Sequence, residues 1–417
     1  MVDQSISSPL FLNMSRKLTG SNSVSQSLGF NIFTQIFELS FSVLTASQLH
    51  PAARLTEVNI DMELFRRLFL FLWDASWFAL QTLWTEATYL AQSSSHSISR
   101  PSMEQQVLAG ECMVLTGGSS GIGLEICRQW LTRGGICVVL SRSKPQIQNS
   151  DETRLRWIPC DLASFENVHA AADEILEQNS GGGISSLVCC AGTMMPDPSL
   201  RSADGHDLSF QVNHLSHALL SLRLANLLGS SGSIIFLSSV AHVAARGILN
   251  LPNSNTVQGR SHPAPICRYT SASTAYAESK LANIMWASAL ARHMAQHRPA
   301  RQLPAIASLH PGVVNTRLYQ HLPPPLSWLQ ATIAPHVFRD ASHPASEVVD
   351  FAVAALSKVA SARDPRQQMG MYYVRGQHVA PTSASKDHVL EDALWAYTLK
   401  LVGLSAIPSR ALLGCRG

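Results

Sequence analysis

The stretch CMVLTGGSSGIGLEICRQWL, residues 112–131, carries the strongest indication of the fold. A short apolar run is followed by the glycines Gly117, Gly121 and Gly123 and then by a helical pattern. Glycines permit a tight turn and a close backbone approach to a phosphate, and a helix start offers free N–H groups to an anion. The pattern is TGxxxGxG rather than GxGxxG. A plain turn is the alternative, but the order strand, turn, helix favours dinucleotide binding.

The rest of the chain repeats this alternation of apolar runs and helical patterns. The runs are CMVLT, ICVVLS, LRWIP, ISSLVCC, GSIIFLS and AIASLHP, and helices are expected near 121–133, 164–179, 206–228 and 276–297. Continuous apolar runs separated by helices are typical of a parallel sheet covered on both faces. We therefore predict an α/β protein, with a doubly wound (Rossmann) domain over residues 108–405 and a tail at 406–417.

Composition excludes several function classes. A net charge of +3 without a basic run argues against nucleic acid as a partner. None of the eight cysteines forms a CxxC pair, so we expect reduced thiols in a cytosol-like compartment, and neither a disulfide framework nor a bound metal. Cys189 and Cys190 are strand neighbours that point to opposite faces, which argues against a disulfide between them.

The N-terminal part differs from the rest. Residues 1–61 are rich in Ser, Gln and Asn, with a weak apolar patch at 30–46 and no signal-peptide pattern. They are expected to form a disordered leader, or to follow an upstream start that the working protein does not need. Residues 62–95 are predicted to form an apolar helix, in which Asp74 is the one charged residue between Leu68 and Trp84. This stretch is short for a membrane span, but its spaced tryptophans suit a helix lying in a membrane surface. A helix packed on the enzyme's own surface is the alternative.

The end of the second strand bears on the choice of coenzyme. An acidic residue there would bind the ribose hydroxyl of NAD, whereas an arginine can pair with the additional phosphate of NADP. Arg142 followed by Lys144 therefore favours NADP(H), with NAD(H) as the alternative. After the third strand, Asp161 stands where a carboxylate could accept a hydrogen bond from the adenine amine.

Tyr276 and Lys280, in YAESK, lie on one face of a predicted helix. A lysine ammonium close to a phenol, together with a positive nicotinamide ring, would lower the pKa of the tyrosine and make it a proton-transfer group. Ser239, at a strand end, could hold a substrate oxygen, and Asn213 could support a water chain to Lys280. Each of these residues also has an ordinary structural interpretation.

These motifs occur together in an order that resembles the short-chain dehydrogenase/reductase family: TGGSSGIG, Asp161-Leu162, QVNHLSHALL, FLSSVAH, YAESKLAN and HPGVVNT. The resemblance is close over residues 110–320 and extends more loosely, through the strand-like GMYYV and the helical VLEDALWAYTLKLVGL, to about 405. Its details are similar to the retinol dehydrogenase-like branch and to members associated with polyprenol and dolichol metabolism. It implies Ser239, Tyr276, Lys280 and Asn213 as catalytic residues. The coenzyme-binding residues that it implies are Thr116, Gly117, Ser119, Ser120, Gly121, Ile122, Gly123, Arg142, Asp161, Leu162, Ala191, Gly192, Tyr276, Lys280, Pro311, Gly312, Val314 and Thr316.

The same resemblance implies an oxidoreductase for a lipophilic alcohol or its aldehyde, such as a polyprenol or a retinoid, at a membrane such as the endoplasmic reticulum, and pairing as a homodimer. Residues 250–270 are expected to form a surface flap, and the apolar, proline-interrupted residues 318–338 a lid. A steroid or general carbonyl reductase and a catalytically silent dinucleotide-binding scaffold are the alternatives. The chain departs from the family's NNAG at Cys189-Cys190, where a loosened strand edge is expected.

Overall fold

The computed structural model describes residues 81–82, 84–89, 107–148, 153–179, 182–194, 197, 199–245, 271–314, 339–357 and 370–404. All of these residues lie in the unit Arg66–Gly417. The expected leader, the flap at 250–270, the lid at 318–338, the tail and most of the N-terminal apolar segment lie outside the described residues.

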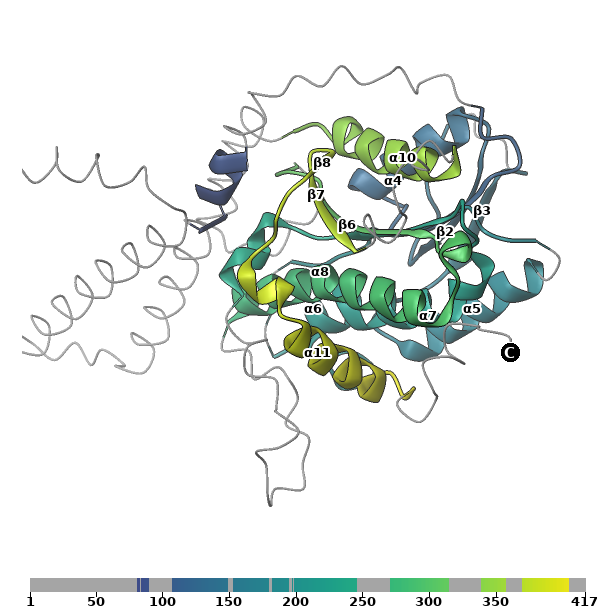
Figure 1. Cartoon of the computed structure of the whole chain (residues 1–417). Helices are drawn as coiled ribbons and strands as arrows, with labels where there is room; N and C mark the ends of the chain where they lie inside the picture. The colour runs from purple at the N-terminus through teal and green to yellow at the C-terminus, as the bar shows by residue number, and fades with distance from the viewer. Residues whose placement is uncertain are drawn as a thin grey trace, which may run out of the picture. The chain divides into compact units, whose positions relative to one another are not determined.

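The centre of the fold is a twisted sheet with the strand order β3-β2-β1-β4-β5-β6-β7-β8 (Figure 1). Strands β1 to β7 are parallel, and β8 pairs antiparallel with β7. The strands are β1 (Cys112–Thr116), β2 (Ile136–Ser141), β3 (Leu155–Pro159), β4 (Ser186–Cys189), β5 (Ser233–Leu237), β6 (Ala305–His310), β7 (Met371–Val374) and β8 (Gln377–His378). The order reverses between β1 and β4, and ligands of such sheets bind at the strand ends beside this point.

Helices cover both faces of the sheet. Figure 1 places α4 (Gly121–Thr132) and α10 (Ser342–Leu356) on one face, and α5 (Phe165–Gln178), α7 (Ser216–Leu224) and α8 (Ala272–His297) on the other. Helix α11 (His388–Leu401) packs outside α8, where Trp395 stacks on Trp286 with ring centroids 4.6 Å apart. The shorter helical segments are α6 (Leu208–Phe210), η3 (Gln211–Leu215), η4 (Ala225–Leu227), η5 (Val240–Ala244), η7 (Ala300–Gln302) and η11 (Ser383–Lys386).

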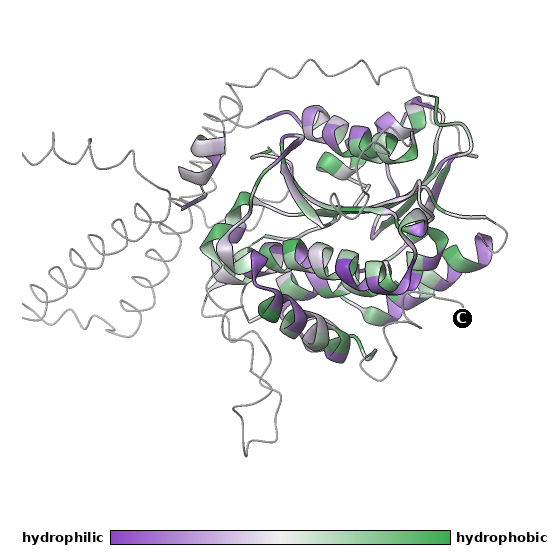
Figure 2. Cartoon of the chain, viewed as in Figure 1, coloured by the Kyte–Doolittle hydropathy of each residue, from purple (hydrophilic) through white to green (hydrophobic). Residues whose placement is uncertain are grey.

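The central strands are largely apolar because they contribute to two hydrophobic cores. In β1, Met113 and Leu115 pack under α4 and α10, whereas Val114 packs toward α5, α7 and α8. Successive side chains of a strand point to opposite faces, so strands in a sheet covered on both sides are nearly continuous apolar runs rather than alternating ones. The helices in Figure 2 carry both hydrophobic and hydrophilic residues, as helices with one buried side do.

The predicted doubly wound α/β fold is confirmed, with two additions. Helix α10 and the short β8 were not among the expected elements, although Val348, Val349, Ala352 and Val353 are buried at a helical spacing that would have indicated α10. Of the N-terminal apolar segment, residues 81–82 and 84–89 are described and are helical. Within the described part of the chain, no helix has the length and hydropathy required to cross a membrane.

Candidate active site

The glycine-rich turn between β1 and α4 forms a cradle that fits a dinucleotide phosphate. Gly117 has a φ of +74°, and a Cβ there would lie 2.8 Å from the Cα of Ala191. A Cβ on Gly123 would lie 2.4 Å from the main-chain oxygen of Gly117, so a larger residue would force the turn away from the helix. Helix α4 begins at Gly121 without a side-chain cap from Ser120, which leaves its first N–H groups available to an anion.

A buried hydrogen-bond network ties this turn to the end of β4. The Thr116 hydroxyl accepts hydrogen bonds from the main-chain N–H groups of Cys190 (2.9 Å) and Ala191 (3.1 Å). Its own proton lies toward Nε2 of His217 (2.9 Å), whose Nδ1 donates to the main-chain oxygen of Asn213 (2.9 Å). Burial lowers the pKa of His217 to about 4, consistent with this neutral form. The thiols at Cys189-Cys190 were expected to loosen this edge, but Thr116 and His217 brace it, and the sequence alone had not indicated their pairing.

The adenosine end of the expected site lies at the ends of β2 and β3. Arg142 directly follows β2 and its side chain is exposed. Asp161 follows β3 and accepts a hydrogen bond from the N–H of Ala163 (3.0 Å), which fixes the orientation of its carboxylate, while Leu162 is buried. An exposed guanidinium at this position is free to pair with a phosphate from solvent.

Ser239, Tyr276 and Lys280 meet at the end of β5. The Ser239 and Tyr276 side chains are hydrogen-bonded, and the Lys280 ammonium lies 5.5 Å from the centre of the Tyr276 ring. Lys280 Nζ donates to the main-chain oxygen of Leu237 (3.1 Å). The neighbouring Ser238 instead donates its hydroxyl proton to the main-chain oxygen of Lys280 (2.8 Å), so of the two serines Ser239 is the one paired with the tyrosine.

Burial dominates the acid–base properties of this cluster. It raises the pKa of Tyr276 to about 12, against the opposing hydrogen bond with Ser239. It lowers the pKa of Lys280 to about 8, against the opposing influence of Cys190. In the protein without coenzyme the pKa of Tyr276 is therefore raised rather than lowered, because the phenol is buried. The expected lowering included the positive nicotinamide ring, and it stays a prediction for the complex.

Asn213 lies in η3, a π-helical turn inserted at the start of the long helical segment. Its side-chain oxygen accepts from the N–H of Thr193 (2.8 Å), and its amide donates to the main-chain oxygen of Thr193 (2.9 Å) and to the Ser279 hydroxyl (2.9 Å). A Cβ on Gly192 would lie 3.3 Å from this oxygen and 3.5 Å from Lys280 Nζ. Asn213 therefore lies beside Lys280, but its amide braces the strand β4 end. Turns of this type occur frequently at functional sites.

The turn after β6 completes the site. Pro311, Gly312 and Val314 lie at the same edge of the sheet, and Thr316 lies outside the described residues. Arg339 donates to the main-chain oxygen of Pro311 (2.9 Å) and pairs with Glu347 (2.9 Å), so it holds this turn to α10. The sequence had not indicated Arg339, because it contacts Pro311 from beyond the intervening residues 315–338.

The six cysteines that the structure describes are free thiols, and five of them are buried. Within the described ranges, no group of three or more histidine, cysteine, aspartate or glutamate side chains is arranged to hold a metal ion.

Comparisons with known proteins show what this chain is similar to. The chain matches the family model of the short chain dehydrogenases over residues 111–249. It is 29% identical over 310 residues to the chloroplastic short-chain dehydrogenase TIC 32 A of Brassica napus, covering 69% of this chain and 88% of the relative. It is 27% identical over 332 residues to a polyprenol dehydrogenase of Danio rerio, covering 76% and 93%. It is 28% identical over 310 residues to retinol dehydrogenase 13 of Homo sapiens, covering 72% and 86%.

Proposed function

We propose, from the premise that this chain belongs to the short-chain dehydrogenase/reductase family and is an NAD(P)-dependent oxidoreductase, that it interconverts a lipophilic alcohol with its aldehyde or ketone. The observation that carries the proposal is the cluster of Ser239, Tyr276 and Lys280 at the sheet edge that also carries the glycine cradle. Both lie at the carboxyl ends of parallel strands, β1 and β5, which are separated only by β4, so a coenzyme could span them.

The roles of the three side chains follow from their chemistry. The coenzyme, when bound, supplies or accepts the hydride at the substrate carbon. Ser239 holds the substrate oxygen by a hydrogen bond. Tyr276, protonated at neutral pH because its pKa is about 12, gives its phenol proton to that oxygen during reduction and takes it back during oxidation. Lys280 holds a positive charge beside the phenol, which favours the phenolate that reduction leaves behind.

The coenzyme proposed is NADP(H) in preference to NAD(H). The support is the exposed Arg142 at the end of β2, without an acidic residue at that strand end. In the proposed complex the glycine cradle holds the diphosphate, and Asp161 faces the adenine.

The substrate proposed is an isoprenoid lipid of the polyprenol, dolichol or retinoid type. Two relatives carry the names polyprenol dehydrogenase and retinol dehydrogenase. The apolar residues 318–338 follow the turn after β6, where they suit a lid over a hydrophobic chain. The sequence of residues 68–84 and the 65% exposure of Trp84 suit a surface that rests on a membrane, for which we propose the endoplasmic reticulum. A homodimer stays a prediction from the family resemblance.

A substrate panel tests this proposal. The purified full chain would be incubated with NADPH or NADH and polyprenals, retinal, steroid ketones and small aldehydes, and with the corresponding alcohols and oxidised coenzymes. We expect selective conversion of an isoprenoid, abolished in Y276F. Selective conversion of steroids or small carbonyls would establish the alternative reductase instead. Coenzyme binding without turnover of any of these substrates would support the alternative of a catalytically silent dinucleotide-binding scaffold.

Vesicle flotation tests the membrane proposal. We expect the full chain to float with phosphatidylcholine vesicles and W84Q to float less, because tryptophan side chains favour the membrane interface. V389S is the matched control, since Val389 is also exposed (72%) but belongs to α11. Equal loss in both variants, or no flotation of the wild type, would contradict the proposal.

A further inference from the structure

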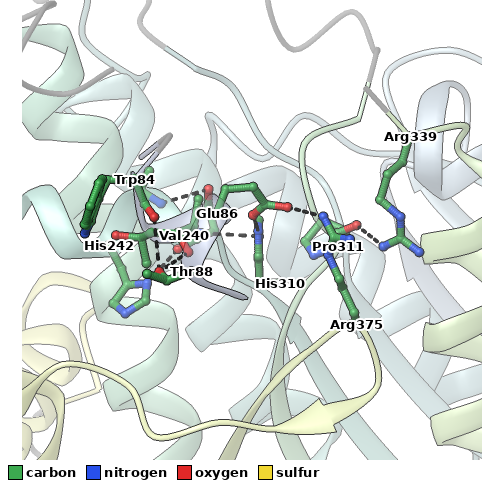
Figure 3. Close-up of polar contacts among 12 residues, drawn as sticks. Trp84, Glu86, Thr88, Val240, His242, His310, Pro311, Arg339 and Arg375 are labelled. Carbon is green, nitrogen blue, oxygen red and sulfur yellow. Dashed lines mark hydrogen bonds and ion pairs between the residues drawn. The ribbon is translucent and has the colours of Figure 1, made fainter. Parts of the chain in front are cut away.

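The helical residues 81–82 and 84–89, which we call the N-terminal helix, include a buried glutamate, Glu86. Glu86 is only 6% exposed, while Trp84, two residues earlier, is 65% exposed. The Glu86 carboxylate accepts a hydrogen bond from Nε2 of His310 (2.8 Å) and forms an ion pair with Arg375 (Figure 3). A buried carboxylate is unfavourable unless it is paired, so this helix is anchored by specific partners rather than by apolar packing alone.

The first partner leads directly to the candidate active site. His310 is the last residue of β6, and its Nδ1 accepts a hydrogen bond from the N–H of Val240 (3.2 Å), the residue after Ser239. Because Nδ1 accepts, the ring proton lies on Nε2, which donates to Glu86. The imidazole therefore links the carboxylate of the N-terminal helix to the backbone beside Ser239.

Glu86 also lies against the turn after β6. Gly312 has a φ of +81°, and a Cβ there would lie 3.6 Å from Oε1 of Glu86 and 2.9 Å from Cδ of Arg339. Arg339 binds the turn through Pro311 from its other side. The turn is thus enclosed between a carboxylate from the N-terminal helix and a guanidinium from the segment before α10.

The second partner adopts an unfavourable backbone conformation. Arg375 is the one non-glycine residue with positive φ (53°) among those that the structure describes, and it forms the tip of the β7–β8 hairpin with Gly376 (φ 76°). A left-handed conformation is unfavourable for a residue with a side chain and persists where the surroundings require it. At Arg375 this conformation accompanies the ion pair with Glu86, whose side chain is almost fully buried.

The balance of charges keeps Glu86 ionised. Burial raises its pKa, but the hydrogen bond from His310, followed by the hydrogen bond and charge of Arg375, outweighs burial and brings the pKa to about 2. Loss of the carboxylate would leave the Arg375 guanidinium and the Nε2 proton of His310 without this acceptor. Replacing Glu86 by glutamine, which exchanges one carboxylate oxygen for an amide nitrogen and removes the charge, should therefore weaken the contacts with His310 and Arg375.

We propose that Glu86 is a positioning residue for the coenzyme: by binding His310 and Arg375, it docks the N-terminal helix against the turn at Pro311-Gly312 and fixes that turn for the nicotinamide end. This inference rests on the proposed role of that turn. It makes the N-terminal helix a component of the active site rather than a membrane attachment alone. Glu86 does not touch the reacting atoms and acts through His310 and Gly312.

The test compares the whole coenzyme with its adenosine bisphosphate half, which lacks the nicotinamide. Dissociation constants for both would be measured on the full-length wild type and on E86Q, using coenzyme fluorescence and calorimetry, with melting temperatures measured in parallel. We expect E86Q to weaken NADPH binding about 10-fold and to leave binding of the half-molecule unchanged, because misplacement of a positioning group affects only the end it positions. E86D, which retains the charge, should recover part of the NADPH affinity.

The matched control is E391Q. Glu391 is also buried (1% exposed) and is also paired with an arginine and a histidine, Arg292 (3.2 Å) and His388 (3.0 Å), but it lies on α11. If E86Q and E391Q change both affinities alike at equal melting temperatures, Glu86 has only a structural role and the inference is wrong. If E86Q does not fold, R375M removes the same ion pair from the hairpin side and must reproduce the selective loss of NADPH.

The readout does not depend on the substrate. Should the panel of alcohols and aldehydes disprove the proposed substrate class, the difference between NADPH and its half-molecule would still decide the role of Glu86. Where a substrate is found, E86Q should raise the KM for the coenzyme and lower kcat, whereas E391Q should change neither at a temperature where both are folded.

Discussion

Lys280 places its ammonium 5.5 Å from the centre of the Tyr276 ring while donating a hydrogen bond to the main-chain oxygen of Leu237. The two side chains share a face of α8, one turn apart, and the carbonyl at the end of β5 fixes the lysine. Asn283 donates to the same carbonyl (3.1 Å). The protein's own hydrogen bonds therefore hold Tyr276 and Lys280 in position before ligands bind, so binding does not have to order the two side chains.

The first prediction concerns the phenol of Tyr276. Y276F removes the hydroxyl and retains the ring, which is 4% exposed, so the fold should be preserved. We expect turnover to fall about 10²- to 10⁴-fold in both directions, the range typical of general acid–base catalysis. Steady-state rates and coenzyme titrations would be measured together. Y373F, a tyrosine of β7 outside the cluster, is the control and should retain activity. Unchanged turnover in Y276F would exclude the proposed mechanism.

The second prediction follows from the pKa of Lys280, which burial lowers from 10.5 to about 8. Between these values the unfolded chain binds more protons at this position than the folded protein, so stability should rise with pH from 8 to 10.5. A lowering from 10.5 to about 8 corresponds to a contribution on the order of 3 kcal/mol. The buried charge of Lys280 therefore lowers the free energy of unfolding most below pH 8, and this destabilisation decreases as the pH rises above 8.

The variant K280M isolates this contribution, because methionine fills similar space without a titrating group. Chemical unfolding of the wild type and K280M would be compared at intervals from pH 7 to 10.5 (10.5 being the ordinary value for lysine). The stability of the wild type relative to K280M should increase across that interval. A constant difference would mean that Lys280 titrates at its ordinary pKa in the folded protein.

The third prediction concerns coenzyme choice at Arg142. R142A should weaken NADPH binding about 10-fold and leave NADH binding unchanged, since one charge-assisted contact to a phosphate contributes at this level. R142D should reverse the preference, because an aspartate can bind the ribose hydroxyls of NADH and repels the phosphate. R156A, at an exposed arginine of β3, controls for the general effect of charge. Equal losses for NADPH and NADH in R142A would contradict an NADP-specific role.

The fold was predictable because its determinants are local. Both faces of the sheet are covered, so strands such as β1 and β2 are unbroken apolar runs, and their bounds match the expected stretches. The helix expected near 276–297 is α8, which begins four residues earlier, at Ala272, because Ser271 caps it by accepting a hydrogen bond from the N–H of Thr274. The positions of Ser239 and Pro311 at the site edge follow from the ends of β5 and β6.

The contacts that support the site were not predictable in the same way. Glu86 binds a histidine and an arginine that lie 224 and 289 residues later in the chain, and no local pattern indicates such a pairing. The π-turn at Asn213 and the orientation of Lys280 toward Leu237 likewise depend on tertiary hydrogen bonds. The raised pKa of Tyr276 depends on its burial, which spacing in the sequence does not reveal.

The last prediction concerns the hydrogen bonds of Thr116 that brace the end of β4. The buried Thr116 hydroxyl serves two main-chain N–H groups, those of Cys190 and Ala191, and the ring nitrogen of His217. T116V retains the shape of the side chain but leaves these groups without their partner in a buried environment. We expect the free energy of unfolding to fall by about 3 kcal/mol, the effect of leaving buried polar groups unpaired.

T116S, which retains the hydroxyl, separates this effect from packing. It should stay within about 1.5 kcal/mol of the wild type, because only a methyl group is lost. Urea unfolding of the two variants provides the measurement, and coenzyme titration should show weaker binding in T116V, since Ala191 and Gly192 border the cradle. If T116V and T116S were equally stable, the Thr116 hydroxyl would not brace this strand end.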